Sequence, residues 1–491
     1  MVKVKDVLTP LEMKATDKNT QYNHIPTLVL MENAGSKIAD YIINNFPEKK
    51  KVSIYAGTGG NGGDGFVIAR HLLNHGYKVR LFLLSKPENI KNDDSKINYE
   101  SIKIIAQTDK NLKLSIITDS TQIQPDNSDI IVDAILGTGV NGKLRQPISG
   151  AVDTINYSPA IVVSVDVPSG LNPENGQVAD KTVVAHTTLT LHKMKTGLLK
   201  AQKTYVGEIN VLDIGIPKVS EEYVGQGDLL KLKKPKTDSH KGQNGSVLIV
   251  GSNPDYIGAV VFAANACLTQ LVDLVYIVAP ENSANIIKQY NPEFIVRGVE
   301  GKILTMDAFD TIKELSDKVD AILIGSGSGV EDETSDLFNE IVSSIKKPFV
   351  IDADALKLVS KDLLNENIIV TPHRQEFNKL FGVDVPKKLE DKIGLLSELS
   401  QEYGVTILLK DVVDVITCVD DYKLNKTGNQ GMTIGGTGDL LAGLTVALAT
   451  KHNPFEAAYI ASFILGCAAD KVLDEKGFNY GIEDILNQLK K

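Results

Sequence analysis

An acidic residue surrounded by glycines stands out in the second half of the chain. Residues Thr433–Gly443 read TIGGTGDLLAG, and Asp439 directly precedes an apolar run. Glycine lets backbone N–H groups come close to a ligand, and a helix N-terminus favours negative charge, so a glycine-rich turn entering a helix can bind an anion. Asp439 fits either a helix N-cap or an acid that takes a proton from a substrate. The motif alone leaves both interpretations open.

The first half of the chain has a comparable stretch. Residues Gly57–Gly65 read GTGGNGGDG and lie between a predicted strand, Val52–Ala56, and a predicted helix, Phe66–Asn74. Two more predicted strands, Ile130–Ala134 and Ile161–Val165, also end at an aspartate beside a glycine-bearing turn. A strand, a glycine-rich loop and a helix in series are typical of doubly wound sheets, so we expect a ligand pocket at the carboxyl ends of these strands.

The composition limits the class of protein. The chain has 491 residues, 42% of them hydrophobic and 23% charged, with a net charge of -10. This length predicts more than one domain, and the acidic balance argues against nucleic acid or an anionic membrane as the main partner. The scattered Cys267, Cys418 and Cys467 form neither a disulfide framework nor a CxxC metal site. With no signal pattern or membrane-spanning run in view, we expect a cytoplasmic protein.

The elements that must position these residues form two α/β series. A change of composition at Lys218–Gly225 marks the expected boundary between them. Residues 1–46 are expected to be helical, and the second series is expected to include a β-pair, Ile407–Lys410 with Val413–Thr417. The other elements predicted in the second half are the strands Ser246–Gly251, Leu274–Ala279, Ala321–Gly325, Phe349–Ile351 and Ile368–Val370, and the helices Gly258–Gln270, Asp439–Ala449 and Glu456–Leu473.

The motifs in combination resemble those of the bifunctional NAD(P)H-hydrate repair enzymes, over nearly the whole chain. The resemblance implies a Rossmann-like doubly wound epimerase domain over residues 1–218 and a ribokinase-like α/β dehydratase domain over residues 224–491. We also expect a homo-oligomer. The motifs are MENAG at Met31–Gly35, GNGGDGFVIARHL at Gly60–Leu72, DAILGTG at Asp133–Gly139, SVDVPSGLN at Ser164–Asn172, KTGL at Lys195–Leu198, HKGQNGSVLIVGS at His240–Ser252, DADAL at Asp352–Leu356, TPH at Thr371–His373 and GMTIGGTGDLLAG at Gly431–Gly443.

For the first domain, the resemblance implies interconversion of the R and S hydrates of NADH and NADPH. Asp166 is expected to transfer the proton, with Lys195 as a helper. Asn61, Asp133 and Ser169 correspond to family positions that bind a potassium ion, and their oxygen donors suit a hard cation. The expected substrate contacts are Gly60, Asn61, Gly62, Gly63, Asp64, Gly137, Thr138, Gly139, Val140, Asn141, Gly142, Lys143 and Asp166.

For the second domain, the resemblance implies dehydration of the S hydrate at the expense of ADP or ATP, with magnesium and a phosphorylated intermediate. Asp439 is the expected general base. Asp352 and Asp354 are candidates for holding magnesium through water, or for capping a helix. The expected hydrate contacts are Gly327, His373 and Asp439. The expected nucleotide contacts are Lys410, Asp414, Asn429, Gly431, Thr433, Gly435, Gly436, Thr437 and Gly438.

Some positions depart from the family's pattern. Gly60 stands where Asn is common, Asp411 stands where Gly usually follows the lysine, and TPHRQE at Thr371–Glu376 lacks the small residue and Gly that normally precede the Glu. A carboxylate beside a nucleotide phosphate is unfavourable, so we expect reduced or altered activity. The alternatives are a small-molecule kinase of the ribokinase group and a nucleotide-binding protein with a decayed second site. The remaining departures are the loop Gly325–Gly329, where Pro and Leu are usual, and Leu271–Val272, where Gly-Ala is usual.

Overall fold

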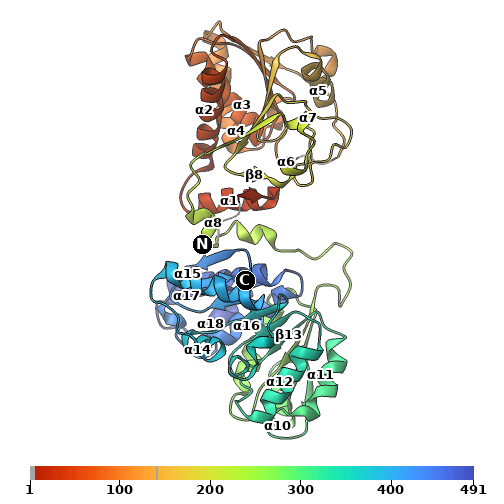
Figure 1. The fold of residues 1–491 in the computed structure, drawn as a ribbon, viewed down its shortest axis with the longest axis vertical. Coiled ribbons are helices and arrows are strands. Elements are labelled where there is room, and N and C mark those ends of the chain that lie inside the picture. The colour runs from red at the N-terminus through yellow and green to blue at the C-terminus, as the bar shows by residue number, and fades with distance from the viewer. Residues whose placement is uncertain (1–5, 140–141) are drawn as a thin grey trace. The chain divides into compact units, whose positions relative to one another are not determined.

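The computed structural model describes residues 6–139 and 142–491, which form two compact units (Figure 1). The N-terminal unit contains residues 6–220 and 226–230, and the C-terminal unit contains residues 221–225 and 231–491. Two short elements lie where the chain passes between the units, α8 (Val219–Glu222) and the 3-10 helix η3 (Asp228–Lys231). The assignment of one activity to each of residues 1–218 and 224–491 stays a prediction.

The N-terminal unit is built on a seven-stranded sheet in which every neighbouring pair is parallel. The strand order is β4-β3-β2-β5-β6-β7-β9, so the direction of winding reverses between β2 and β5. A doubly wound sheet binds its ligands at such a reversal. The strands are β2 (Lys51–Ala56), β3 (Lys78–Leu83), β4 (Leu112–Ile116), β5 (Ile130–Ala134), β6 (Ile161–Val165), β7 (Thr187–Leu191) and β9 (Glu208–Leu212).

Helices cover both faces of this sheet. One apolar cluster joins side chains of α2, α3 and α4 to the sheet, and another joins α5 to the opposite face. The pairing of β1 with β8 adds a separate two-stranded parallel sheet. The elements are β1 (Val7–Leu8), α1 (Pro10–Tyr22), α2 (Thr27–Asn45), α3 (Gly60–Asn74), α4 (Asp93–Thr108), α5 (Ile148–Tyr157), β8 (Met194–Lys195), α6 (Thr196–Lys200) and α7 (Lys203–Val206), with short 3-10 turns at Pro87–Asn89 and Ser120–Gln122.

Two predictions for this unit are corrected. The N-terminal region holds two helices with a break at residues 23–26, where His24 takes a positive φ of 63° and Pro26 precedes α2. Helix α3 begins at Gly60, whereas a loop was predicted up to Gly65. The first turns of this helix pack so tightly that glycine is needed in them: a Cβ at Gly62 would lie 2.0 Å from the carbonyl oxygen of Gly57.

The C-terminal unit has a nine-stranded sheet of order β12-β11-β10-β13-β14-β15-β16-β17-β18. The strands from β12 to β16 are parallel, and the last two pairs are antiparallel. The winding reverses between β10 and β13, and the predicted β-pair is β16 with β17. The strands are β10 (Ser246–Val250), β11 (Leu274–Pro280), β12 (Phe294–Val299), β13 (Ala321–Ile324), β14 (Phe349–Ile351), β15 (Ile368–Val370), β16 (Thr406–Leu409), β17 (Asp414–Thr417) and β18 (Tyr422–Asn425).

In this unit α16 packs between α9 and α17, while α11, α12, α14 and α15 share a second core with the sheet. Helix α16 begins at Thr437, two residues before the predicted start, after Gly436 with a φ of 102°. The α/β fold class expected for both halves is confirmed. The helices are α9 (Ile257–Leu268), α10 (Glu281–Ile287), α11 (Phe309–Ser316), α12 (Asp332–Ser344), α13 (Ala355–Leu358), α14 (Arg374–Phe381), α15 (Leu389–Tyr403), α16 (Thr437–Ala449), α17 (Pro454–Lys476) and α18 (Ile482–Leu489), with 3-10 turns at Met306–Ala308, Lys361–Leu363 and Gln430–Met432. Within the described ranges, no helix is long and apolar enough to cross a membrane.

Candidate active sites

A cavity of about 870 Å³ lies at the carboxyl ends of β2, β5 and β6 in the N-terminal unit. This volume is in the range of pockets that hold small molecules and cofactors. Of the predicted substrate contacts, the structure brings the following to its wall, together with Lys195: Gly60, Asn61, Asp64, Gly137, Thr138, Gly139 and Asp166. Gly62, Gly63, Gly142 and Lys143 do not line it. Val140 and Asn141 fall outside the described residues.

The glycines in this wall differ in how much room they leave for a side chain. A Cβ at Gly57 would lie 2.0 Å from the carbonyl oxygen of Ile135, at the point where the ends of β2 and β5 meet. A Cβ at Gly137 would lie 2.6 Å from Oδ1 of Asn61. At Gly60, in contrast, a Cβ would meet nothing within 4 Å. The loops are therefore fixed in shape, except that Gly60 leaves room for a side chain.

Asp166 and Lys195 form a buried ion pair on this wall. Lys195 Nζ lies 2.5 Å from Asp166 Oδ1, and the lysine side chain has no exposed surface. The same Oδ1 accepts hydrogen bonds from the Leu191 N–H at 3.1 Å and the Thr190 hydroxyl at 3.2 Å. Asp166 follows β6 in the left-handed region, with a φ of 62°. A non-glycine residue there costs on the order of 1 to 3 kcal/mol, so the surrounding contacts must hold the acid in place.

Two further acids belong to this site. Burial raises the pKa of Asp17 to about 6, the charge of Lys195 opposes the rise, and that of Asp166 adds to it. Burial, with the charges of Asp166 and Asp17, also places the pKa of Asp64 well above its ordinary value. Asp64 was expected from its motif, whereas Asp17 was missed. The only signal for Asp17 was its helical spacing, since it shares one face of α1 with Met13 and Gln21.

The residues expected to hold potassium are partly assembled. Asp133 and Ser169 are fully buried, and Asp133 accepts hydrogen bonds from the Ser169 hydroxyl at 2.6 Å and the Ser169 N–H at 2.8 Å. The Asn61 amide donates to the carbonyl oxygen of Val165 at 2.8 Å, which leaves its Oδ1 available. Burial raises the pKa of Asp133 against these hydrogen bonds. A carboxylate, a hydroxyl and an amide oxygen fit an alkali cation by donor chemistry.

In the C-terminal unit, charged residues gather after β14, β15 and β16. Lys410 Nζ lies 3.0 Å from Asp352 Oδ1 and 3.7 Å from Glu376 Oε2. The Thr371 hydroxyl donates to Asp352 Oδ1 at 2.7 Å. Burial alone would lower the pKa of Lys410, but the carboxylates of Asp352 and Glu376 outweigh it and raise the pKa. Lys410 is therefore a fixed cation at the carboxyl edge of the sheet.

Asp439 lies beside this cation without being paired to it. Burial raises the pKa of Asp439 to about 7, the negative charge of Asp352 adds to the rise, and Lys410 opposes it. In the part of the chain that the structure describes, no hydrogen bond or ion pair holds the Asp439 carboxylate. The neighbouring Gly438 faces Lys410, since a Cβ there would lie 3.6 Å from Nζ. Asp439 can therefore gain or lose a proton near neutral pH.

The two other predicted hydrate contacts have structural partners. His373 is the N-cap of α14, and its Nδ1 accepts hydrogen bonds from the N–H groups of Gln375 at 3.1 Å and Glu376 at 3.3 Å. A β-bridge to Lys410 brings His373 to the same sheet edge. Gly327 has a φ of 63°, and a Cβ there would lie 2.5 Å from the carbonyl oxygen of Tyr256. The contact of either residue with a hydrate stays a prediction.

The structure accounts for two departures from the family's pattern together. Asp411 Oδ2 accepts hydrogen bonds from Arg374 Nη2 at 2.8 Å and Nε at 3.1 Å, and from Lys392 Nζ at 2.6 Å. Burial acts to raise the pKa of Asp411, but hydrogen bonds from Lys392, the Val412 N–H and Arg374 hold the pKa below its ordinary value. Arg374 comes from the unusual TPHRQE stretch. One departure thus supplies positive charge to balance the other.

The predicted nucleotide contacts form a scaffold around the glycine-rich turn. Asp414 accepts hydrogen bonds from the Ser462 hydroxyl at 2.5 Å and the Asp411 N–H at 3.0 Å. Asn429 donates to Asp470 at 3.0 Å and accepts from the Tyr480 hydroxyl at 2.5 Å. Sequence reasoning missed Asp470 and Tyr480, because their link to Asn429 depends on helix packing.

The other nucleotide candidates lie in the turn itself. The Thr437 hydroxyl donates to the Met432 carbonyl at 2.9 Å, and a Cβ at Gly431 would lie 2.4 Å from the Tyr480 hydroxyl oxygen. The Thr433 hydroxyl donates to the Gln430 carbonyl at 2.9 Å. At Gly435 a Cβ would meet nothing within 4 Å, so its backbone is open to a ligand.

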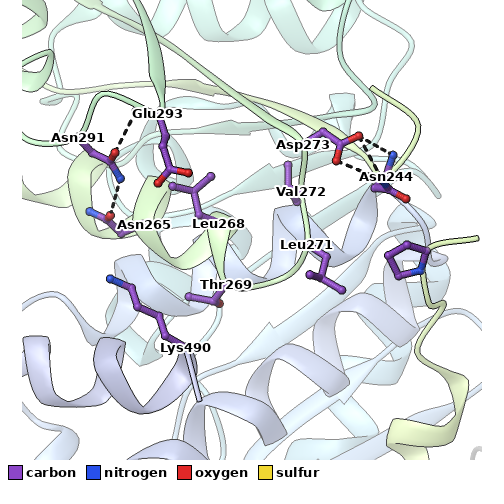
Figure 2. A pocket seen from close by; sticks show the side chains of 11 residues that line it. Asn244, Asn265, Leu268, Thr269, Leu271, Val272, Asp273, Asn291, Glu293 and Lys490 are labelled. Carbon is purple, nitrogen blue, oxygen red and sulfur yellow. Dashed lines mark hydrogen bonds between the residues drawn. The ribbon is translucent and has the colours of Figure 1, made fainter. Parts of the chain in front are cut away.

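A second cavity, of about 540 Å³, lies at the amino ends of β10, β11 and β12 in the same unit (Figure 2). Its lining includes Leu271 and Val272, the pair that departs from the family's Gly-Ala. None of the predicted site residues lines it. The departure at Leu271–Val272 therefore lies at the opposite edge of the sheet from Asp439 and Lys410.

Two α/β units, each with acids and a lysine at the carboxyl edge of its sheet, define an enzyme with two sites. The family described as YjeF-related protein N-terminus matches residues 27–197, and that described as NAD(P)H-hydrate dehydratase matches residues 247–491. The bifunctional NAD(P)H-hydrate repair enzyme of Methanothermobacter thermautotrophicus is 41% identical, over 98% of this chain and 94% of the relative. That of Pyrobaculum aerophilum is 39% identical, over 99% of this chain and 97% of the relative. The chain belongs to the family of bifunctional NAD(P)H-hydrate repair enzymes.

A solved structure of a ribokinase-like superfamily protein from Enterococcus faecalis also aligns with part of the chain. The identity is 24%, the TM-score is 0.48, and the alignment covers 55% of this chain and 94% of that protein.

Proposed function

We propose that this chain repairs hydrated NADH and NADPH in two steps. The N-terminal unit interconverts the R and S hydrates, and the C-terminal unit returns the S hydrate to the reduced cofactor at the expense of ADP or ATP. The observation that carries this proposal is the similarity to the bifunctional repair enzymes over almost the whole length of both chains. The acids at the carboxyl edges of both sheets support it.

Epimerisation requires the hydroxyl at C6 of the ring to leave and to return on the other face. Asp166 exchanges the proton, and Lys195 holds the Asp166 carboxylate in place through the 2.5 Å ion pair. The cavity at β2, β5 and β6 accommodates the dinucleotide. A potassium ion on Asn61, Asp133 and Ser169 would supply positive charge beside the phosphates.

Dehydration begins when the hydrate's hydroxyl oxygen attacks the terminal phosphorus of ADP or ATP; the bond from that phosphorus to its bridging oxygen breaks, and AMP or ADP leaves. Asp439 takes the hydroxyl proton. General-base catalysis of this kind raises the rate on the order of 100-fold to 10,000-fold. The N–H groups of Gly435, Gly436 and Gly438, together with Lys410, stabilise the transferred group. The C6–O bond then breaks with loss of phosphate and of a proton from C5, which restores the C5=C6 double bond.

Magnesium would bind with the nucleotide and neutralise charge on its phosphates. Asp352 and Asp354 would hold it through water. Asp352 is anchored by Lys410 and Thr371, and Asp354 accepts hydrogen bonds from the Gly329 N–H at 3.0 Å and Lys357 Nζ at 2.8 Å. A cytoplasmic location and a homo-oligomeric state stay predictions from the sequence.

The direct test supplies mixed hydrate epimers to the full chain with magnesium and either ADP or ATP. We expect recovery of the reduced-nicotinamide absorbance and release of free phosphate. A stable phosphorylated product would instead indicate a small-molecule kinase, and nucleotide binding without turnover would indicate a decayed second site. Chiral separation of the hydrates, without nucleotide, tests the epimerase separately.

A further inference from the structure

Helix α1 forms one wall of the cavity in the N-terminal unit. The lining residues Met13, Asp17 and Gln21 recur every four positions, so they lie on one face of the helix. Asp17 is the only acid on this face. Its carboxylate therefore faces the same cavity as Asp166 and Lys195, but from a different element.

Three sets of contacts fix α1 at this wall. Strand β1 pairs with β8 so that Leu8 lies opposite Lys195, two residues before α1 begins. A capping box between Thr9 and Glu12 closes the first turn, with hydrogen bonds of 2.8 and 3.2 Å. The buried Asn19 holds the other end, since it donates to Asp228 at 2.8 Å. Asp17 is thus carried on a rigid element.

The charged groups facing Asp17 come from every side of the cavity. Lys195 of β8 and His192 before it act to lower the pKa of Asp17, whereas the acid Asp166 after β6 acts to raise it. Asp64 of α3 is a further acid at this site, and the charge of Asp17 acts to raise its pKa. Lys14 and Lys18 flank Asp17 on its own helix and also line the cavity. Among the residues that the structure describes, no hydrogen bond or ion pair occupies the Asp17 carboxylate. Asp166 differs, because three donors already share its Oδ1.

The epimerisation assigned above needs two proton-carrying groups on different walls. As the C6–O bond breaks, the leaving hydroxyl takes a proton and departs as water, while the ring nitrogen's lone pair forms an N1=C6 double bond. Water then attacks C6 from the opposite face and gives up a proton, and the electron pair returns to nitrogen. One acid loses a proton and another gains one, so no other reactant is consumed.

We propose that Asp17 is a catalytic residue of the epimerase site, and that it exchanges this proton in partnership with Asp166. The inference rests on the proposed epimerase function. In one direction Asp17 protonates the leaving hydroxyl while Asp166 receives the proton of the incoming water, and the reverse direction exchanges the two roles.

The pH dependence follows from the shared proton. Both directions start from enzyme in which one member of the pair is protonated. Burial sets the pKa of Asp17 at about 6, with Lys195 and His192 opposing and Asp166 adding to the rise. Asp17 therefore loses its proton as pH rises through about 6, and kcat/KM for epimerisation falls about tenfold per pH unit above that value.

The test measures epimerisation by the full chain, with R-enriched NADPH hydrate as the probe and the rate without enzyme subtracted at each pH. Asp17→Asn should lower kcat on the order of 100-fold or more, change KM little, and remove the decline above pH 6. Asp17→Glu should recover part of the rate and keep a decline. Asp40→Asn, a matched change at an exposed site of α2, should leave the rate and the profile unchanged.

The outcomes separate this inference from the function on which it rests. If the unmodified chain fails to epimerise the hydrate, the proposed epimerase function fails. If the unmodified chain is active and Asp17→Asn keeps both its kcat and its pH profile, only the role of Asp17 is overturned. Thermal unfolding and dehydration of pure S hydrate by the same variant establish that it is folded. If the Asn variant does not fold, Asp17→Glu decides: a catalytic role predicts that the decline above pH 6 moves to a different pH, because the titrating carboxylate has changed, whereas a structural role predicts the pH profile of the unmodified chain.

Discussion

The two sites use their lysines differently. In the N-terminal unit Lys195 contacts Asp166, the acid that the sequence motif points to, at 2.5 Å. In the C-terminal unit Lys410 contacts Asp352 and Glu376 instead, and Asp439 stays unpaired among the described residues. Burial raises the pKa of Asp439 to about 7 in the second site and that of Asp17 to about 6 in the first, and the nearby lysine opposes the rise in both. In the described part of each unit an acid with a raised pKa therefore lies near the lysine without forming an ion pair with it.

The largest expected effect tests whether the two sites are independent. Asp439→Asn keeps the shape of the side chain but removes the base, so dehydration should fall on the order of 100-fold to 10,000-fold. Epimerisation by the same variant, followed by chiral separation of the hydrates, should be unchanged. Asp166→Asn should give the reverse pattern. Loss of both activities in either variant would contradict the assignment of one reaction to each unit.

The pH dependence of dehydration is the next largest effect. Burial and Asp352 raise the pKa of Asp439 to about 7, and the base acts as the carboxylate. The rate should therefore fall about tenfold per pH unit below 7 and level off above it. Asp352→Asn removes a negative neighbour of Asp439 and frees Lys410. The fall in rate should therefore occur at lower pH in this variant, whatever the change in its maximum rate. If the rate of the variant falls at the same pH as that of the unmodified chain, Asp439 is not the titrating group.

A smaller effect concerns the charge balance at Asp411. Arg374→Ala removes one of its two cationic partners, so the KM for nucleotide should rise roughly twofold to fivefold, in line with a partly exposed ion pair. Lys379→Ala, an exposed change on the same helix, should have no effect. Arg374→Ala combined with Asp411→Gly should return the KM toward that of the unmodified chain. A double variant as weak as Arg374→Ala alone would mean that Arg374 acts on the nucleotide by itself.

The smallest effect concerns Gly60. Because a Cβ there meets nothing within 4 Å, Gly60→Asn should fold normally and offer the substrate an additional polar group. We expect the KM for the hydrate to fall by a few-fold at most, since one hydrogen bond contributes about 1 kcal/mol. Gly57→Asn is the contrasting change, because its Cβ would lie 2.0 Å from a carbonyl oxygen. It should lower the melting temperature, which calorimetry would measure.

The buried central strands could be predicted from sequence, whereas several others could not. Apolar runs that end at polar or turn-forming residues gave β5, β6, β14 and β15 with the observed ends. Strand β7 was missed because its sequence, TTLTL, looks polar. Its threonines are nevertheless buried, and the hydroxyls of Thr187 and Thr188 donate to backbone carbonyls. A polar residue whose hydrogen bonds are made by a distant segment has no local signature.

The same limit applies to the sites. Each of the residues that could be named lies in a sequence motif: Asp166, Lys195 and Lys410 at the ends of strands, and Asp439 in the glycine-rich turn that enters α16. Asp17 could not, since its place at the cavity depends on the pairing of Leu8 with Lys195, far along the chain. The departure at Asp411 looked harmful for a similar reason, because its partners Arg374 and Lys392 lie on other elements.

The way the chain passes between its two units has a practical consequence for dividing the enzyme. Residues 221–225 belong to the C-terminal unit, where Tyr223 bridges to Leu424, and residues 226–230 belong to the N-terminal unit, where the Gly227 N–H donates to Asn19. Protease cleavage or gene splitting at a single point in this stretch leaves at least one half without residues that belong to it. Separately expressed halves would each keep all of their own residues only if both contained residues 221–230. One fragment would then end at residue 230, and the other would begin at residue 221.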